Sequence, residues 1–270
     1  MKFFEGCTAL ITGASSGLGA EFARQLAPTA HALVLVARRN DRLEALRAEF
    51  SEKFPQLSVF IYAADLADEG ARVAFANWLR DQGIRVDFLV NNAGLGDHGA
   101  FETSEWTRVR AMLDVNVTAL THLTHLLLPS LRGSGRAAIL NVSSVASFFP
   151  LPNMAVYAAT KAYVTSLSEA LRMELRDTNV SVTALCPGPV KTEFFDVATR
   201  TGDEANAAHF ESMPIFKVAP EEAVHAGLLA VARDRARVVP GPVLAVAVAL
   251  AAVVPFFIVR QILQAGRARI

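Results

Sequence analysis

The segment that most constrains how this chain can fold is a glycine-rich turn between an apolar run and a helical segment. Cys7 to Thr12 is apolar, Gly13 to Gly19 follows directly, and Ala20 to Ala27 has a helical pattern. In this context missing side chains let the backbone approach a pyrophosphate at the helix N-terminus. The glycine spacing differs from the usual dinucleotide fingerprint, so the strand and helix around the turn carry the prediction of a phosphate site.

Apolar runs and helical segments alternate along the rest of the chain. This rhythm predicts right-handed crossovers and a parallel sheet covered on both faces. We therefore predict an α/β fold, a single doubly wound parallel sheet within residues 1–240, followed by an apolar helical tail, 241–270. Further strands are predicted at 31–37, 57–63, 86–90, 136–142 and 180–186, and helices at 40–54, 68–82, 103–131 (with a break near Asp114) and 154–176.

Composition excludes several classes of function. The 26 Lys and Arg residues balance 26 Asp and Glu residues, so a nucleic-acid partner is not expected, because phosphate backbones require a basic surface. Cys7 and Cys186 lie in separate apolar runs and are expected to be buried free thiols, and a cytoplasmic location is expected. His122 and His125 lie one helical turn apart, but no further ligand cluster accompanies them, so no metal site is predicted.

Polar residues follow the carboxyl ends of the predicted strands, where ligands bind on parallel sheets. Arg38 and Arg39 follow the second strand, and no acid precedes them to bind a free ribose 2′-hydroxyl. An arginine there accommodates a 2′-phosphate, which favours NADP(H) over NAD(H). The alternative is that both arginines are solvated at the start of the next helix, which we favour more for Arg39. Asp65 and Leu66 follow the third strand, where a carboxylate could bind a base edge.

A second motif contains a phenol and an ammonium one helical turn apart. Tyr157 and Lys161 share one face of a predicted helix, and Ser144 lies thirteen residues before Tyr157 at the end of a strand. A nearby cation favours the phenolate, so we expect Lys161 to lower the pKa of Tyr157. Such a pair alone is common, and a buried residue such as Asn116, on the preceding helix, is more often a packing or capping residue than a catalytic one.

Together these motifs resemble the short-chain dehydrogenase/reductase family in its single-domain form, over roughly residues 5–240. The resemblance implies a Rossmann fold and hydride transfer between NADP(H) and a CH–OH group. It implies that Tyr157 is the general acid or base, that Lys161 lowers the pKa of Tyr157 and contacts the nicotinamide ribose, and that Ser144 polarises the substrate oxygen. Asn116 would hold a water through its backbone carbonyl. Cofactor contacts are implied for Gly13, Ser15, Ser16, Gly17, Leu18, Gly19, Arg38, Asp65, Leu66, Asn92, Ala93, Gly94, Tyr157, Lys161, Pro187, Gly188, Val190 and Thr192.

Apolar residues flank the predicted catalytic positions and point to the substrate class. We expect about half of them to line a pocket and the rest to be core, which favours a small hydrophobic substrate such as a 3-oxoacyl, steroid-like or retinoid-like compound. The alternative functions are a membrane-attached reductase of lipid metabolism and a non-catalytic NADP-binding scaffold. The apolar residues are Phe148, Phe149, Leu151, Pro152, Phe194, Phe195, Met213, Ile215 and Phe216.

The tail contains an uncharged run from Val243 to Val259, shorter than the roughly 20 residues of a spanning helix. Pro255 interrupts it, and proline favours the first turn of a helix, so two short helices are predicted. A lid or a subunit interface is the leading interpretation, and peripheral membrane contact through residues 243–263 and a true span are the alternatives. The family resemblance implies a homo-oligomer, a dimer or tetramer.

Overall fold

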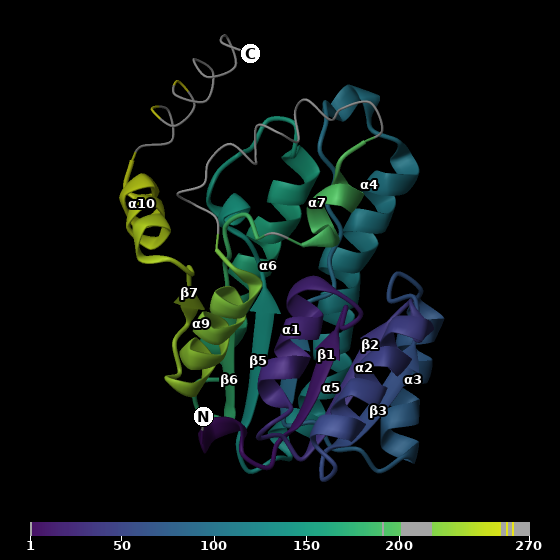
Figure 1. Ribbon diagram of the computed structural model, residues 1–270. Helices are drawn as coiled ribbons and strands as arrows, with labels where there is room; N and C mark the ends of the chain where they lie inside the picture. Colours follow the sequence, from purple (N-terminus) through teal and green to yellow (C-terminus); the bar gives the residue numbers. More distant parts are fainter. Residues whose placement is uncertain (1, 191, 201–217, 255–257, 259–260, 262–270) are drawn as a thin grey trace.

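A seven-stranded parallel sheet forms the centre of the molecule (Figure 1). The computed structural model describes residues 2–190, 192–200, 218–254, 258 and 261. The strand order β3-β2-β1-β4-β5-β6-β7 reverses direction beside β1, as in a doubly wound sheet, so the predicted fold class is confirmed. The strands are β1 (Thr8–Thr12), β2 (Ala32–Ala37), β3 (Ser58–Ala63), β4 (Phe88–Asn91), β5 (Ala137–Val142), β6 (Val180–Leu185) and β7 (Arg237–Val238).

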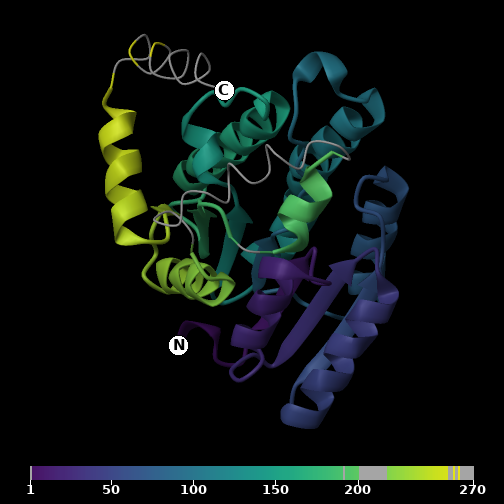
Figure 2. The ribbon, with the colours of Figure 1, turned by 45° about the horizontal axis from the view of Figure 1, so that its top comes forward.

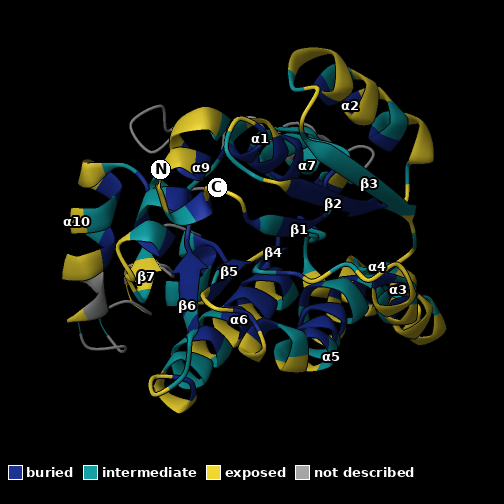
Figure 3. Cartoon of the chain, turned by 90° about the horizontal axis from the view of Figure 1, so that it is seen from below, coloured by how far each residue is buried: buried dark blue, intermediate teal, exposed yellow. Residues whose placement is uncertain are grey.

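Helices cover both faces of the sheet, and Figure 3 shows the sheet between the two layers. One layer contains α1 (Gly17–Leu26), α2 (Asn40–Lys53) and α9 (Pro220–Ala232), and the other contains α3 (Glu69–Asp81), α5 (Leu120–Arg132) and α6 (Ala155–Glu174). Alternate residues of one strand enter opposite layers: Ile11 packs with the α1 layer and Leu10 with the α3 layer. Since both strand faces are buried, β2 and β5 are apolar almost throughout.

The predicted break near Asp114 is a change in helix type. Helix α4 (Trp106–Leu113) continues into the π-helical segment η3 (Asp114–Ala119) and then into α5. A π-helical segment widens the turn, and such segments are frequent at functional sites. Here it carries Asn116, whose side chain is buried.

Three short segments with 3-10 geometry complete this part of the chain: η1 (Lys2–Phe4), η2 (Phe101–Thr103) and η4 (Val145–Phe148). Strand β7 was not predicted. It has two residues and pairs with β6 through Ala184 and Leu185, so it carries no alternating pattern that a sequence could reveal.

After β6 the chain forms α7 (Glu193–Ala198), and later α10 (Pro242–Ala252) lies at the β7 edge (Figures 1 and 2). Helix α10 confirms the first of the two predicted tail helices, and the second, apart from residues 258 and 261, falls outside the described residues. No helix in the described residues is both long and apolar enough to cross a membrane. The division at residue 240 stays a prediction.

Candidate active site

A cavity of about 360 Å³ opens at the carboxyl ends of the strands. Most of its lining comes from the loops after β1 to β6, as the topology requires, and helices such as α6 and α7 add to it. Of the predicted site residues, Gly19 and Asn116 do not line it. Those that do are Gly13, Ser15, Ser16, Gly17, Leu18, Arg38, Asp65, Leu66, Asn92, Ala93, Gly94, Ser144, Tyr157, Lys161, Pro187, Gly188, Val190 and Thr192.

The turn after β1 needs glycine for two different reasons. Gly13 has φ +65°, and a Cβ there would lie 2.9 Å from the Cα of Ala93. A Cβ on Gly19 would lie 2.2 Å from the Gly13 carbonyl oxygen, so Gly19 allows α1 to pack on the turn. Ser16, Gly17 and Leu18 at the start of α1 line the cavity, and a helix N-terminus favours an anionic group. This end of the cavity therefore fits a pyrophosphate.

The loop after β4 is fixed to the same turn by hydrogen bonds. Asn92 Nδ2 donates to the Thr12 carbonyl at 2.9 Å, and the backbone N–H groups of Asn92 and Ala93 both donate to Thr12 Oγ1 at 3.0 Å. A Cβ on Gly94 would lie 3.4 Å from Lys161 Nζ. Glycine at this position leaves the ammonium group accessible from the cavity.

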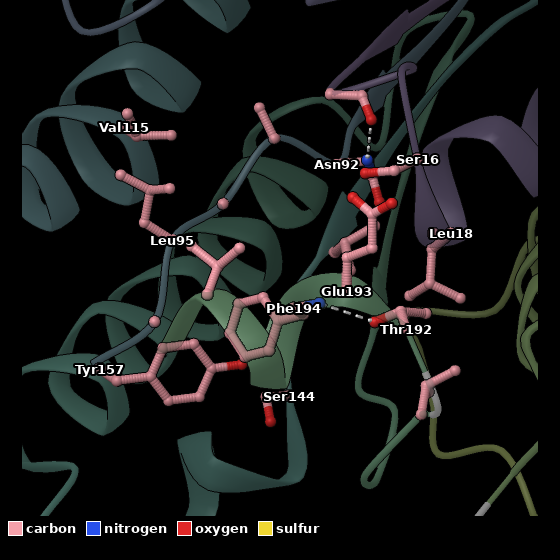
Figure 4. Close-up of a pocket in the computed structure, with 18 of the residues that line it drawn as sticks. Ser16, Leu18, Asn92, Leu95, Val115, Ser144, Tyr157, Thr192, Glu193 and Phe194 are labelled. Carbon is pink, nitrogen blue, oxygen red and sulfur yellow. Dashed lines mark hydrogen bonds between the residues drawn. The ribbon is translucent and has the colours of Figure 1, made fainter. Parts of the chain in front are cut away.

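Ser144, Tyr157 and Lys161 meet at the β5 side of the cavity. Ser144 follows β5, while Tyr157 and Lys161 lie on α6. Figure 4 shows the Tyr157 phenol directed toward Ser144, with the ring of Phe194 beside it, and the two ring centroids are 5.5 Å apart. Lys161 Nζ lies 5.8 Å from the Tyr157 ring centroid and donates to the Val142 carbonyl at 2.8 Å.

The electrostatics of this group differ from the prediction. Burial raises the pKa of Tyr157 to about 12, and the hydrogen bond with Ser144 opposes that rise. Burial also lowers the pKa of Lys161 to about 8, because the cavity wall replaces water around the ammonium. The prediction that Lys161 lowers the pKa of Tyr157 is wrong for this arrangement, in which burial dominates and the ammonium is directed to a backbone carbonyl.

Asn116 supports the cavity wall from behind. Its Nδ2 donates to the Leu95 carbonyl at 2.9 Å and to Thr160 Oγ1 at 3.0 Å, and its Oδ1 accepts from the Leu95 N–H at 2.8 Å. The side chain thus joins the loop after β4 to α6. The role predicted for its backbone carbonyl is not tested by these contacts.

The arginines after β2 are placed differently from one another. Both line the cavity, but Arg38 is exposed, whereas Arg39 donates to Ser15 Oγ at 3.3 Å and Ser16 Oγ at 2.8 Å. Arg39 also pairs with Glu193, the first residue of α7. The solvated position favoured for Arg39 is therefore correct only in part, because its side chain is 41% exposed at the start of α2 but also makes these contacts. Glu193 was not predicted at all, because no local pattern links residues 154 positions apart.

The part of the cavity around Tyr157 is apolar. Leu151 and Phe194 line it as expected, but Phe148, Phe149 and Pro152 do not, and Phe148 lies 5.2 Å under the Arg237 guanidinium. The side chain of Phe195 and residues Met213, Ile215 and Phe216 lie outside the described residues. Sequence reasoning missed further lining residues of small or medium size: Leu95, Gly96, Val115, Val145, Ala146, Met154 and Val197.

The remaining candidates lie away from the cavity. His122 Nδ1 accepts a hydrogen bond from Arg72 Nε at 3.0 Å, and His125 is exposed on α5. In the described part of the chain, no three His, Cys, Asp or Glu residues form a group that could hold a metal. Cys7 and Cys186 are buried free thiols, as predicted.

Comparison with known sequences identifies close relatives. Residues 7–202 match the family model of the short chain dehydrogenases. The chain is 43% identical over 200 residues to a sulfoacetaldehyde reductase of Chromohalobacter salexigens, covering 72% of this chain and 76% of that protein. It is 38% identical over 203 residues to serine 3-dehydrogenase of Agrobacterium fabrum, covering 74% and 78%.

Two solved structures share the fold and differ in cofactor. A short-chain dehydrogenase from Sphingobium yanoikuyae in complex with NADPH has a TM-score of 0.77 and 35% identity, covering 86% of this chain and 87% of that one. A family member from Burkholderia phymatum in complex with NAD has a TM-score of 0.82 and 27% identity, covering 92% and 93%. With the sheet topology and the cavity at its carboxyl edge, these matches place the chain in the short-chain dehydrogenase/reductase family, as an oxidoreductase that acts on CH–OH groups with NAD(P).

Proposed function

We propose that this protein is an NADP(H)-dependent oxidoreductase that acts on a hydrophobic carbonyl compound or the corresponding alcohol. The observation that carries the proposal is the apolar wall around Tyr157 and Ser144. Among the described residues lining this side, Lys161 is the only cation, and it donates to the Val142 carbonyl. A small anionic substrate would need a cationic partner there, whereas 3-oxoacyl, steroid-like and retinoid-like compounds would not.

The site residues suit reduction of such a carbonyl group. The cofactor supplies the hydride when it is bound. Because burial raises the pKa of Tyr157 to about 12, the phenol keeps its proton at neutral pH and can donate it to the oxygen on which negative charge develops. Ser144 lies beside the phenol and would hold the same oxygen. Lys161, whose ammonium group is left accessible by the missing side chain of Gly94, would contact a ribose hydroxyl of the cofactor.

The preference for NADP(H) is supported by the residues after β2. Ala37 ends that strand where an acid would bind a free 2′-hydroxyl, and Arg38 and Arg39 follow in the cavity lining. Arginine binds phosphate through two parallel N–H groups. NADPH should therefore bind more tightly than NADH, and Arg38→Ala together with Arg39→Ala should remove most of the difference. Equal affinities in the unaltered protein would refute this part of the proposal.

The substrate class can be tested by following NADPH oxidation with carbonyl compounds of graded chain length, using sulfoacetaldehyde as the small anionic comparison. We expect kcat/KM to rise with apolar length. A highest kcat/KM for sulfoacetaldehyde would contradict the proposal. Tyr157→Phe should keep NADPH binding and remove turnover, and unchanged turnover in this variant with several carbonyl substrates would refute the role of the phenol.

A membrane-attached reductase is the second candidate, and α10 favours it. Four aliphatic side chains on this helix and just after it are 59% to 78% exposed, namely Val243, Val246, Leu250 and Val253. Their spacing places them on one helical face. Flotation of the full-length protein with anionic lipid vesicles tests this candidate, with Val246→Asp/Leu250→Asp as the matched variant. Failure of the full-length protein to float would exclude membrane attachment. The tail could then form a subunit interface, and light scattering would show whether the protein is the homo-oligomer that the family resemblance implies.

A further inference from the structure

Glu193 places a carboxylate at the end of the cavity that contains the two arginines. It begins α7, and its Oε2 lies 3.0 Å from Arg39 Nη1, while its Oε1 pairs with Arg42. Arg39 is at the same time hydrogen-bonded to Ser15 and Ser16 of the glycine-rich turn. Figure 4 shows the Glu193 carboxylate directed toward Ser16. An acid from the loop after β6 thus reaches the arginines that follow β2.

The Glu193–Arg39 ion pair lies at one end of the cavity, away from Tyr157. Glu193 and Arg39 both line the cavity that contains Tyr157, and in the sheet β2 is separated from β5 by β1 and β4. On a doubly wound sheet the residues after β2 lie where the adenosine ribose binds. The pair therefore occupies the end of the cavity where a 2′-phosphate would be recognised.

The carboxylate and a phosphate would make the same contacts. Each presents oxygens that accept parallel N–H groups from a guanidinium, so they compete for the same donors. The hydrogen bonds and charges of Arg42 and Arg39 lower the pKa of Glu193, so the group is ionised at neutral pH. Any affinity that Arg39 and Arg42 provide for a 2′-phosphate is therefore reduced by the free energy of the Glu193 pairs.

We propose that Glu193 is a selectivity residue of the cofactor site, whose carboxylate competes with the cofactor 2′-phosphate for Arg39 and Arg42. The inference rests on the proposed function, because it assumes that the arginines after β2 bind this phosphate. Glu193 narrows the preference for NADP(H) without affecting the contacts made by the rest of the dinucleotide. The competing explanation is a structural ion pair that only fastens α7 to α2.

The test uses two probes that differ only in the 2′-phosphate, 2′,5′-ADP and 5′-AMP, titrated calorimetrically into the full-length protein. Glu193→Gln should bind 2′,5′-ADP roughly two- to fivefold more tightly, the range that exposed ion pairs provide, with 5′-AMP unchanged. The control is Glu44→Gln, which removes another exposed pair at α2, with Arg47. It should leave both affinities unchanged.

The competing explanation predicts a different pattern. If Glu193 only fastened α7, Glu193→Gln would change the affinities for the two probes by the same factor or leave both unchanged, and either result would overturn the inference. Weaker binding of 2′,5′-ADP would overturn it too. Thermal unfolding of the variant confirms that it is folded, which is expected because Glu193 is 44% exposed.

The proposed preference for NADP(H) and the proposed role of Glu193 are tested by different measurements. That preference depends on the ratio of NADPH to NADH affinities in the unaltered protein, whereas the role of Glu193 depends on how this ratio changes in Glu193→Gln. A protein that preferred NADH but gained affinity for 2′,5′-ADP on substitution would refute the NADP(H) preference and support the competition. If the unaltered protein preferred NADPH and the ratio of NADPH to NADH affinities were the same in Glu193→Gln, the NADP(H) preference would be supported and the competition refuted.

Discussion

The buried Lys161 side chain is expected to destabilise the folded protein, so Lys161→Met should raise the free energy of unfolding. The side chain is 5% exposed, and burial lowers its pKa from 10.5 in water to about 8. At about 1.4 kcal/mol for each unit of pKa, that fall corresponds to roughly 3 kcal/mol against the charged form in the folded state.

One contact reduces the expected gain. Lys161 Nζ donates to the Val142 carbonyl at 2.8 Å, and an unpaired buried carbonyl costs about 1 kcal/mol. Methionine keeps most of the apolar stem, so little cavity is created. We therefore expect Lys161→Met to be about 2 kcal/mol more stable at pH 7, which for a chain of this length raises the melting temperature by about 4 °C. Turnover should be lost at the same time.

The stability difference between the two proteins should change with pH, because the folded and unfolded states release the Lys161 proton at different pH values. Below pH 8 lysine is charged in both the folded and the unfolded protein, so the penalty is complete. Above pH 8 the folded state releases the proton while the unfolded state keeps it up to about pH 10.5, so the unaltered protein gains about 1.4 kcal/mol of stability per pH unit relative to the variant. The advantage of the variant should shrink markedly between pH 7 and pH 9.

The measurement is urea unfolding of both proteins at pH 7 and pH 9. Lys53→Met is the matched control, because its ammonium is 59% exposed beside Glu49, and it should change stability by less than about 0.5 kcal/mol at both pH values. A Lys161→Met variant that is no more stable than the unaltered protein at pH 7 would refute the reasoning. So would a difference that does not depend on pH.

Three further substitutions test other parts of the structure. Asp97→Asn should lower the free energy of unfolding by roughly 2–3 kcal/mol at pH 7, because the buried carboxylate pairs with Arg200 at 2.7 Å. Burial opposes ionisation of Asp97, but Arg200 holds the pKa of Asp97 below the ordinary value. The carboxylate therefore stabilises the fold above about pH 4, and this stabilisation is lost below it. Urea unfolding should show a smaller difference between the variant and the unaltered protein at pH 3 than at pH 5. Asn141→Ala should lower the free energy of unfolding by roughly 2 kcal/mol in the same assay, because the buried side chains of Asn91 and Ser168 each lose a hydrogen bond to Asn141. An unchanged free energy of unfolding would show that these hydrogen bonds do not stabilise the fold. Ser144→Ala should reduce kcat by about 10²-fold with little change in NADPH affinity, measured by steady-state kinetics and fluorescence titration.

The sequence by itself determined the order of the first six strands and the helices between them, and the edge of the sheet where the site lies. Both follow from local patterns: buried strands are continuous apolar runs, and right-handed crossovers carry every strand end to one edge. The glycine-rich turn could be recognised for the same reason, because the chemistry of Gly13 and the start of α1 depends on neighbouring residues. Ser144 and Tyr157 were expected after the fifth strand and on the helix that follows it, and both line the cavity.

The tertiary structure alone decided the protonation of the site and the pairs between distant residues. Lys161 was expected to act on Tyr157 through its charge, but both groups are buried, and burial moves their pKa values in opposite directions. The pairing of Arg39 with Glu193 depends on α7 lying over the start of α2. Desolvation and contacts between distant side chains exist only after the chain has folded, so no pattern of neighbouring residues records them.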